Sequence, residues 1–388
     1  MKLSEARSNV IDMGIKLLQT GLIARTWGNV SSRLDENHFV ITPSGRDYTD
    51  LTPEEIVIVN ISDGRSWGDV RPSSEKGVHL VGYKNNKKVN FIVHTHQPEA
   101  SVLSAIGIDV MTEAAGFGLV NKIPCAAYGF PGSDTLRDNV EAALEGDQYR
   151  VVLMAHHGAV CLGNDHEDAL RLAASLEMLA SFRIRRAFEE YIGRPMRMDD
   201  SLYDTVLNNF DVRLPETVQP FCKSERMGDV IAYYLPDGGT MELEMDEPAL
   251  VEEQRIHQQI YKARPDIGGI MHSMTPSAIA YSTLNRPLGT YLDDFAQING
   301  VEMQCSAIDE DAVVAALGDN HGVLLENNGA LCCGKNLYDA EALSMVTEKN
   351  ARSFLIGQLF PDHPIETVPR EECEKMRDFY LQSYSKRF

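Results

Sequence analysis

The stretch HLVGYKNNKKVNFIVHTHQP, residues 79–98, is matched further along the chain by HQQIYKARPDIGGIMHSMTP, residues 257–276. A second pair, VVLMAHHGAVCLGNDHEDAL (residues 151–170) and GVLLENNGALCCGKNLYDAE (residues 322–341), follows in the same order. Two matches in the same order indicate that one domain has been duplicated. The repeat is far longer than the roughly 20–50 residues of a solenoid repeat, so it predicts two tandem globular domains.

The boundary between the two copies is expected in GRPMRMDDSLYDTVLNNFDVRLPETVQP, residues 193–220, where Gly and Pro bracket a weakly periodic segment. We place it after residue 215, which gives domains 1–215 and 216–388. Within each copy, short β-rich runs such as NFIVHTH alternate with helical patterns such as DHEDALRLAASLEMLASFRIRRAFEEY. Strands covered by helices predict an α/β fold built from two three-layer α/β/α domains.

The composition narrows the classes of partner. A net charge of −21 repels phosphodiester backbones and anionic lipids, so we expect neither nucleic acid nor a membrane as partner. A small anionic substrate stays compatible with this charge, because a metal and backbone N–H groups can make one pocket positive. Seven cysteines without C-x-x-C spacing, and an N-terminus that lacks a long apolar run, predict free thiols and a cytoplasmic location.

Two histidines end a predicted buried strand, FIVHTH, residues 91–96. His94 and His96 are two residues apart, so their side chains leave the strand on the same face. This spacing suits metal ligands, although such a pair alone is weak evidence. His157 follows a second apolar strand and precedes a glycine, which lets backbone or ligand come close. Together the three imidazoles could bind a divalent ion.

Three short polar segments are common turns when each is taken singly. Residues 72–75, Pro-Ser-Ser-Glu, are expected to open a helix that continues through His79 and Tyr83. That helix start would offer hydroxyls, N–H groups and a positive dipole end to an anion, with a carboxylate beside them. The other two segments are WGNVS, residues 27–31, and TPSG, residues 42–45. His79 itself is expected to be a packed or hydrogen-bonded helix residue and not a ligand.

The ordered set GLIARTWGNVSSR, FVITPSGRDYTDLTPEEIVIV, RPSSEKGVHLVGY, FIVHTHQP, IPCAAYGFPGS and AHHGAVCLG spans essentially the whole first copy. In this set the chain resembles the class II aldolase/adducin family, and most closely its fuculose-1-phosphate and rhamnulose-1-phosphate aldolase branch. The resemblance implies a mostly antiparallel central sheet. It also implies a carbon–carbon lyase, an aldolase that cleaves a small phosphorylated ketose into a dihydroxyacetone-phosphate-like half and an aldehyde.

The resemblance also implies roles for single residues. Zinc, with manganese or cobalt as alternatives, would be held by His94, His96 and His157, and Glu75 would be the catalytic acid/base. A substrate-phosphate cradle would be formed by Gly28, Asn29, Ser44, Gly45, Ser73 and Ser74. An epimerase, a dehydratase or a decarboxylase of the same family is the alternative; epimerases usually carry Asp where Glu75 stands.

The second copy is expected to have lost the metal site. HSM, residues 272–274, replaces H-x-H, and NNG, residues 327–329, replaces H-H-G. A thioether and an amide are poor zinc ligands, so this copy resembles a degenerate aldolase domain. A non-enzymatic, adducin-like interaction protein is therefore a second alternative, against which the intact ligand set of the first copy argues.

A tyrosine could explain why the second copy is kept. Aldolases of the family are fourfold rings, and a tyrosine donated across the subunit interface acts on the aldehyde half. The first copy has Glu113 at the corresponding place, and the second has Tyr291. The resemblance thus implies a homodimer that imitates the fourfold ring and uses Tyr291 as a catalytic residue. Alternatively, Tyr291 is a buried aromatic.

Overall fold

The computed structural model describes residues 1–111, 122–235 and 237–384. The chain folds into two compact units: Met1–Pro195 with Phe360–Glu366, and Met196–Leu359 with Thr367–Phe388. The division lies inside the predicted linker, 20 residues before the boundary that we placed after residue 215. The short helix α6 (Leu202–Leu207) explains this difference, because it packs on helices of the second unit.

The helices and strands of the first unit follow in chain order: α1 (Leu3–Gln19), β1 (Asn29–Arg33), β2 (His38–Ile41), β3 (Val57–Asn60), β4 (Ser66–Trp67), α2 (Lys76–Asn85), β5 (Phe91–Thr95), α3 (Pro98–Ile106), β6 (Val110–Met111), β7 (Lys122–Ile123), β8 (Cys125–Ala126), α4 (Asp134–Leu144), β9 (Val151–Met154), β10 (Gly158–Gly163) and α5 (His166–Ile192). Within the described residues of this unit, eight strands form one sheet in the order β4-β3-β2-β1-β5-β10-β9-β8. Among the described strands of this sheet, only the β8–β9 pair is parallel.

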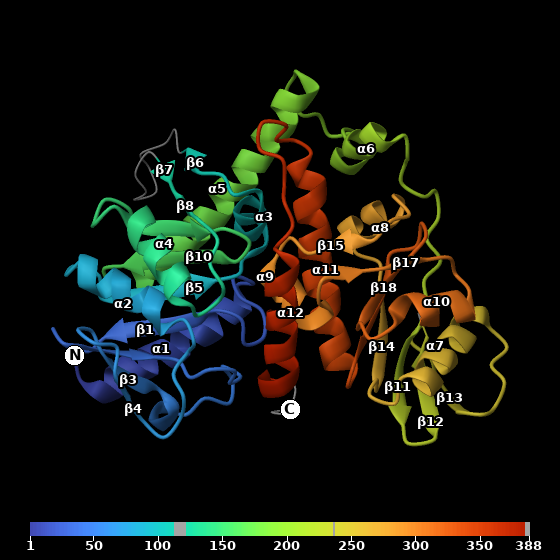
Figure 1. The fold of residues 1–388 in the computed structure, drawn as a ribbon, viewed down its shortest axis with the longest axis horizontal. Coiled ribbons are helices and arrows are strands. Elements are labelled where there is room, and N and C mark those ends of the chain that lie inside the picture. Colours follow the sequence, from blue (N-terminus) through green and yellow to red (C-terminus); the bar gives the residue numbers. More distant parts are fainter. Residues whose placement is uncertain (112–121, 236, 385–388) are drawn as a thin grey trace. The chain divides into compact units, whose positions relative to one another are not determined.

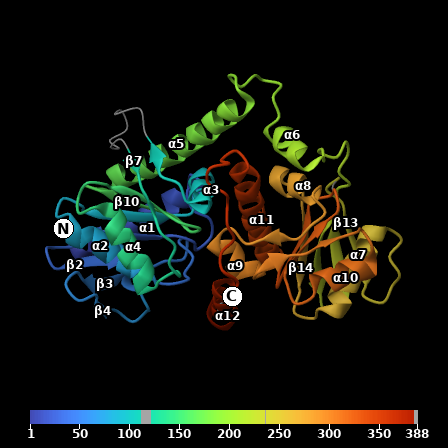
Figure 2. The same cartoon turned by 45° about the horizontal axis from the view of Figure 1, so that its top comes forward.

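Helices cover both faces of this sheet (Figure 1). Apolar side chains of α2 and α4 pack with alternate strand residues, including Ile92 of β5, in one core. Helices α1, α3 and α5 pack against the other face. The long helix α5, which stands out in Figure 2, begins where the Asp165 carboxylate accepts a hydrogen bond from the Asp168 N–H. The first unit is therefore a three-layer α/β/α domain.

The elements of the second unit, besides α6, follow in chain order: β11 (Lys223–Met227), β12 (Val230–Tyr234), β13 (Thr240–Glu244), α7 (Glu252–Ala263), β14 (Gly269–Ser273), α8 (Pro276–Ser282), β15 (Leu288–Gly289), α9 (Asp293–Asn299), β16 (Glu302–Met303), β17 (Cys305–Ser306), α10 (Glu310–Leu317), β18 (Gly322–Leu325), β19 (Ala330–Gly334), α11 (Leu337–Gly357) and α12 (Arg370–Phe379). Across the described residues of this unit, seven strands form a sheet in the order β13-β12-β11-β14-β19-β18-β17.

The seven strands of the second sheet repeat the order of seven strands of the first, from β3 to β8, and β4 has no counterpart among the described residues. The second sheet's one parallel pair among the described residues, β17–β18, corresponds to β8–β9, and α7 and α10 cover one face as α2 and α4 do. The caps repeat as well, because Asn336 caps α11 as Asp165 caps α5. The predicted α/β fold, with two α/β/α domains and mostly antiparallel sheets, is confirmed. Within the described ranges, no helix has the length and apolar character needed to cross a membrane.

Candidate metal centre

The site lies at the end of β5, in the middle of the first sheet. His94 pairs in register with Asn29 of β1 on one side and with Val160 of β10 on the other. Side chains alternate along a strand, so His94 lies on the same face as Ile92, which packs in the core beneath α2. The site is thus built on the helix-α2 face of the sheet.

The structure brings the three predicted histidines together. His94, His96 and His157 are all buried, and their candidate ligand atoms lie within 4.8 Å of one another. The Nε2 atoms of His94 and His96 are 2.9 Å apart, and the rings of His94 and His157 stack at 4.9 Å between centroids. Three buried imidazoles converging in this way are a donor set that fits a divalent ion of the zinc type.

A backbone contact orients one of these rings for metal binding. The Nδ1 atom of His94 lies 2.9 Å from the carbonyl oxygen of Ala159. A carbonyl can only accept, so Nδ1 carries the proton and the lone pair of the neutral ring is on Nε2. Metal-binding histidines commonly donate their second N–H in this manner, which fixes the tautomer and the ring orientation.

Glu75 completes the cluster. Its Oε1 lies 2.6 Å from His157 Nε2, and its Oε2 lies 3.2 Å from His94 Nε2. Burial raises the pKa of Glu75, but the imidazoles of His94, His157 and His96 outweigh burial and hold this pKa well below its ordinary value. A bound cation would act in the same direction, because it too favours the carboxylate.

The helix that follows Glu75 starts later than predicted. Helix α2 begins at Lys76 with Glu75 as its N-cap residue, so the expectation of a helix from Pro72 is wrong. Pro72 instead forms an antiparallel bridge with Pro43, and the Ser73 N–H donates to the carbonyl of Thr42. These backbone contacts hold residues 72 and 73 extended and place the carboxylate at the helix start beside the histidines.

Two glycines let the backbone come close to the histidine strand. A Cβ at Gly28, whose φ is +91°, would lie 2.6 Å from the carbonyl oxygen of His94. A Cβ at Gly158 would lie 2.3 Å from the carbonyl oxygen of Thr95. Both distances are far below van der Waals contact, so any side chain at these positions would displace the strand that carries the ligands.

The residues predicted to hold phosphate fall into two groups. The turns that carry Ser44 and Ser73 lie side by side, since the Ser44 N–H donates to the carbonyl of Arg71 next to the Pro43–Pro72 bridge. Gly45 follows Ser44 with a φ of +63°, and Ser74 is half-buried beside Glu75. A role of these turns, and of Gly28, in binding phosphate stays a prediction.

Asn29 lies differently from the other residues of the predicted cradle. Its side chain is buried, its Nδ2 donates to Oε2 of Glu75 at 2.8 Å, and its Oδ1 is 2.5 Å from Nε2 of His79. The sequence predicts only a packed or hydrogen-bonded helix residue at His79, so its link to the site through Asn29 was missed. A signal was present in the sequence: the His–x–x–x–Tyr spacing of residues 79–83 returns at residues 257–261.

The corresponding place in the second unit is occupied by its own chain. Nδ1 of His272 accepts from the Phe221 N–H at 3.0 Å, and Nε2 of His272 lies 2.5 Å from the carbonyl oxygen of Asn328. Both ring nitrogens are therefore used by the backbone. The Asn328 side chain in turn bonds to the backbone of Gln219. Among the described residues, the histidines of the first unit are the one group that could hold a metal.

Tyr291 lies in the second unit, and its catalytic role stays a prediction. The side chain is 7% exposed, and its ring centroid lies 5.7 Å from that of Phe354. Its backbone N–H donates to the amide oxygen of Asn350. Burial raises the pKa of the phenol, so Tyr291 keeps its proton at neutral pH. Glu113, its predicted counterpart in the first copy, lies outside the described residues.

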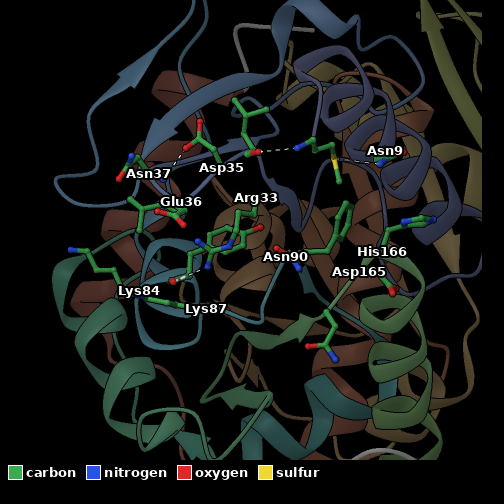
Figure 3. A pocket seen from close by; sticks show the side chains of 16 residues that line it. Asn9, Arg33, Asp35, Glu36, Asn37, Lys84, Lys87, Asn90, Asp165 and His166 are labelled. Atoms are coloured by element: carbon green, nitrogen blue, oxygen red, sulfur yellow. Dashed lines mark hydrogen bonds between the residues drawn. The ribbon is translucent and has the colours of Figure 1, made fainter.

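A separate cavity of about 790 Å³ opens at the opposite end of β5, around Phe91 (Figure 3). Its lining carries both signs of charge, from Lys84, Lys87 and Glu36 among others. The Arg33 guanidinium in this cavity donates to the backbone carbonyls of Tyr83 and Val89, which ties it to the fold. None of the predicted site residues is among those that line this cavity.

The match to a family model defines the class of protein. The chain belongs to the family described as Class II Aldolase and Adducin N-terminal domain, whose model matches residues 8–184 and again residues 223–355. The second match falls on the second sheet-containing unit, as expected of a duplicated domain. The predicted family is confirmed.

Particular relatives extend the comparison. The chain is 31% identical over 215 residues to the 5-deoxy-D-ribulose 1-phosphate aldolase of Bacillus thuringiensis serovar kurstaki. This alignment covers 54% of this chain and 98% of that protein. It is 32% identical over 190 residues to the L-fuculose phosphate aldolase of Haemophilus influenzae, covering 48% of this chain and 85% of that protein. A solved structure of an L-fuculose 1-phosphate aldolase aligns at 26% identity and a TM-score of 0.45, covering 54% of this chain and 97% of its own. The family and the two aldolases similar in sequence confirm the predicted enzyme class, an aldolase and hence a lyase.

Proposed function

We propose that this chain is a metal-dependent aldolase that cleaves a phosphorylated ketose into a dihydroxyacetone-phosphate-like half and an aldehyde. The observation that carries the proposal is the single buried cluster of three imidazoles and the Glu75 carboxylate within the described residues. The relatives support the substrate class, because they are named for 5-deoxy-D-ribulose 1-phosphate and L-fuculose phosphate.

We assign the metal to His94, His96 and His157 and propose zinc, with manganese or cobalt as alternatives. Buried imidazole nitrogens, one of them oriented by the Ala159 carbonyl, suit a borderline-soft ion better than Mg²⁺ or Ca²⁺, which prefer oxygen ligands. When bound, the ion would supply a Lewis acid for the carbonyl and hydroxyl oxygens of the ketose half.

Glu75 is proposed to move the proton. In cleavage, the hydroxyl of the future aldehyde gives its proton to the phenolate of Tyr291, and the electrons of the broken C–C bond stay with the phosphorylated half. Glu75 then returns a proton to that carbon, and in the reverse direction it removes one. Its position beside His94 and His157 places the carboxylate next to the proposed metal ligands.

The remaining roles follow from the turns around the site and from the second unit. Backbone N–H groups and hydroxyls of the turns at Gly28, Ser44, Gly45, Ser73 and Ser74 are proposed to hold the phosphate. Tyr291 is proposed to donate its proton to the aldehyde oxygen of a neighbouring site in the condensation direction, and to take that proton back in cleavage, in a homodimer with pseudo-fourfold symmetry.

The test is a metal assay on the purified chain combined with product analysis on a panel of ketose 1-phosphates. We expect about one metal ion per chain, held by three histidines, and release of a dihydroxyacetone-phosphate-like product with an aldehyde. An epimerised, dehydrated or decarboxylated product would keep the site and change the reaction. A folded chain that binds no metal and cleaves none of the panel would contradict the proposal and favour an adducin-like interaction protein.

A further inference from the structure

His79 lies in the middle of an unbroken chain of buried hydrogen bonds that ends at Glu75. Its Nδ1 is 2.6 Å from Oγ of Ser31, and that hydroxyl is 2.8 Å from Oη of Tyr83. Its Nε2 is 2.5 Å from Oδ1 of Asn29, whose Nδ2 donates to Oε2 of Glu75 at 2.8 Å. His79 is fully buried, so water does not compete for either ring nitrogen.

The chemistry of the groups fixes the direction of every bond in this chain. The Glu75 carboxylate can only accept, so the amide nitrogen of Asn29 must face it and the amide oxygen must face His79. That oxygen accepts from Nε2–H of His79, which leaves Nδ1 to accept from the Ser31 hydroxyl. Burial lowers the pKa of His79 to about 3, so the ring is neutral and has one donor and one acceptor. All donors therefore point toward Glu75.

The second unit contains an equivalent Ser–His–Tyr trio, but the histidine of that trio is not linked to a carboxylate. Ser224 Oγ lies 2.9 Å from His257 Nδ1 and 2.9 Å from Tyr261 Oη. Ser31 and Ser224 hold equivalent places, since they pair in register with Ile92 and Ile270, and Cys222 thus stands where Asn29 is. Among the described residues, Nε2 of His257 has no hydrogen-bond partner.

This difference between the units separates a structural part of the hydrogen-bond chain from a functional part. The Ser–His–Tyr trio occurs in both units, so it does not depend on the candidate metal centre. The Asn29 link occurs only in the unit that has the histidine cluster. A glutamate side chain has several rotatable bonds, and a directed hydrogen bond to one oxygen restricts how the other can be presented.

We propose that His79 and Asn29 are positioning residues that hold the Glu75 carboxylate in the orientation needed for proton transfer. The proposal rests on the aldolase function proposed above. It reassigns the Asn29 side chain from the phosphate to Glu75, because both polar ends of its amide are already used. Substituting a residue that orients a metal ligand or catalytic group typically lowers activity about 10–100-fold.

Kinetics of matched variants test the positioning role of His79 and Asn29. We expect His79→Leu to lower kcat about 10–100-fold with little change in KM, while His257→Leu leaves kcat unchanged. His79→Gln keeps an N–H donor near the place of Nε2 and should recover most of kcat. Asn29→Cys copies the second unit and should lower kcat as His79→Leu does. A raised KM with unchanged kcat in Asn29→Cys would instead indicate that Asn29 binds substrate. That result would contradict the proposal that Asn29 positions Glu75.

A second readout does not depend on activity. The imidazole ¹⁵N shifts of His79 in the intact chain should report a neutral Nε2–H ring, and Asn29→Cys should shift the Nε2 resonance. An Nδ1–H tautomer, or a spectrum unaffected by Asn29→Cys, would contradict the proposed hydrogen-bond chain even if the enzyme cleaves ketose phosphates. Conversely, a wild-type chain that shows the predicted tautomer but cleaves no substrate would refute the proposed function and leave the hydrogen-bond chain standing.

Discussion

The two units share a scaffold and differ in the groups placed on it. Seven strands follow the same order in both, and both have a glycine, Gly158 or Gly329, whose Cβ would lie 2.3 Å from a carbonyl oxygen of the neighbouring strand. In the first unit three imidazoles and Glu75 converge, and in the second the backbone occupies both nitrogens of His272. The fold therefore does not require the histidine cluster, which supports a catalytic role for the metal over a structural one.

The largest effect should come from removing one proposed metal ligand in the first unit. His96→Ala is expected to empty the proposed metal site and lower the cleavage rate by ~10³-fold or more, since a Lewis acid supplies several kcal/mol of transition-state stabilisation. Met274→Ala, at the matching place in the second unit, should change neither metal content nor rate. Elemental analysis beside an activity assay measures both. Two metal ions per wild-type chain would contradict the expectation that the second unit binds none.

The next effect concerns the carboxylates at equivalent positions. Glu75→Gln should keep the metal and slow cleavage ~10²–10⁴-fold, the usual worth of a positioned acid/base. Glu253 stands four residues before His257, as Glu75 stands four before His79. Glu253→Gln therefore serves as the control, and the rate should stay at the wild-type level. If Glu75→Gln cleaved substrate normally, Glu75 would be only a charge at the start of helix α2.

Tyr291 tests whether the second unit contributes to catalysis. Tyr291→Phe removes one hydroxyl and almost no volume, so folding and metal content should persist while the rate falls ~10²-fold. Tyr281, another buried tyrosine beside Phe354, provides the control, because Tyr281→Phe should leave the rate unchanged. A structure of the assembled oligomer gives the decisive measurement. A Tyr291 hydroxyl more than roughly 10 Å from every histidine cluster would exclude direct proton transfer, which needs ~2.6–3.2 Å or one intervening water.

The smallest effect should be the same in both units. Ser31→Ala and Ser224→Ala each remove the hydroxyl that bonds a buried histidine and tyrosine. Each change should lower the free energy of unfolding by about 1–3 kcal/mol, the cost of buried polar groups left without a partner. Denaturant unfolding of the two variants compares the losses. A loss confined to Ser31→Ala would show that the trio is not a shared structural element.

The sequence by itself determined the repeat, the fold class and the set of metal-binding candidates. These predictions rest on local rules. His94 and His96 share a face because strand side chains alternate, and the duplicated motifs required two domains of the same fold. The loss of ligands in the second copy was likewise visible in the letters at Met274 and Asn328.

Only the tertiary structure decided where the polar side chains around the cluster point. Glu75 meets Asn29, 46 residues away, and Asn29 meets His79, 50 residues away, because β1, β5 and helix α2 bring them to one face of the sheet. The helix after Pro72 was predicted too early for the same reason, since the bridge from Pro72 to Pro43 overrides local helix signals. Helix propensity and capping act over a few residues, whereas hydrogen-bond partners of buried amides are set by strand register and packing.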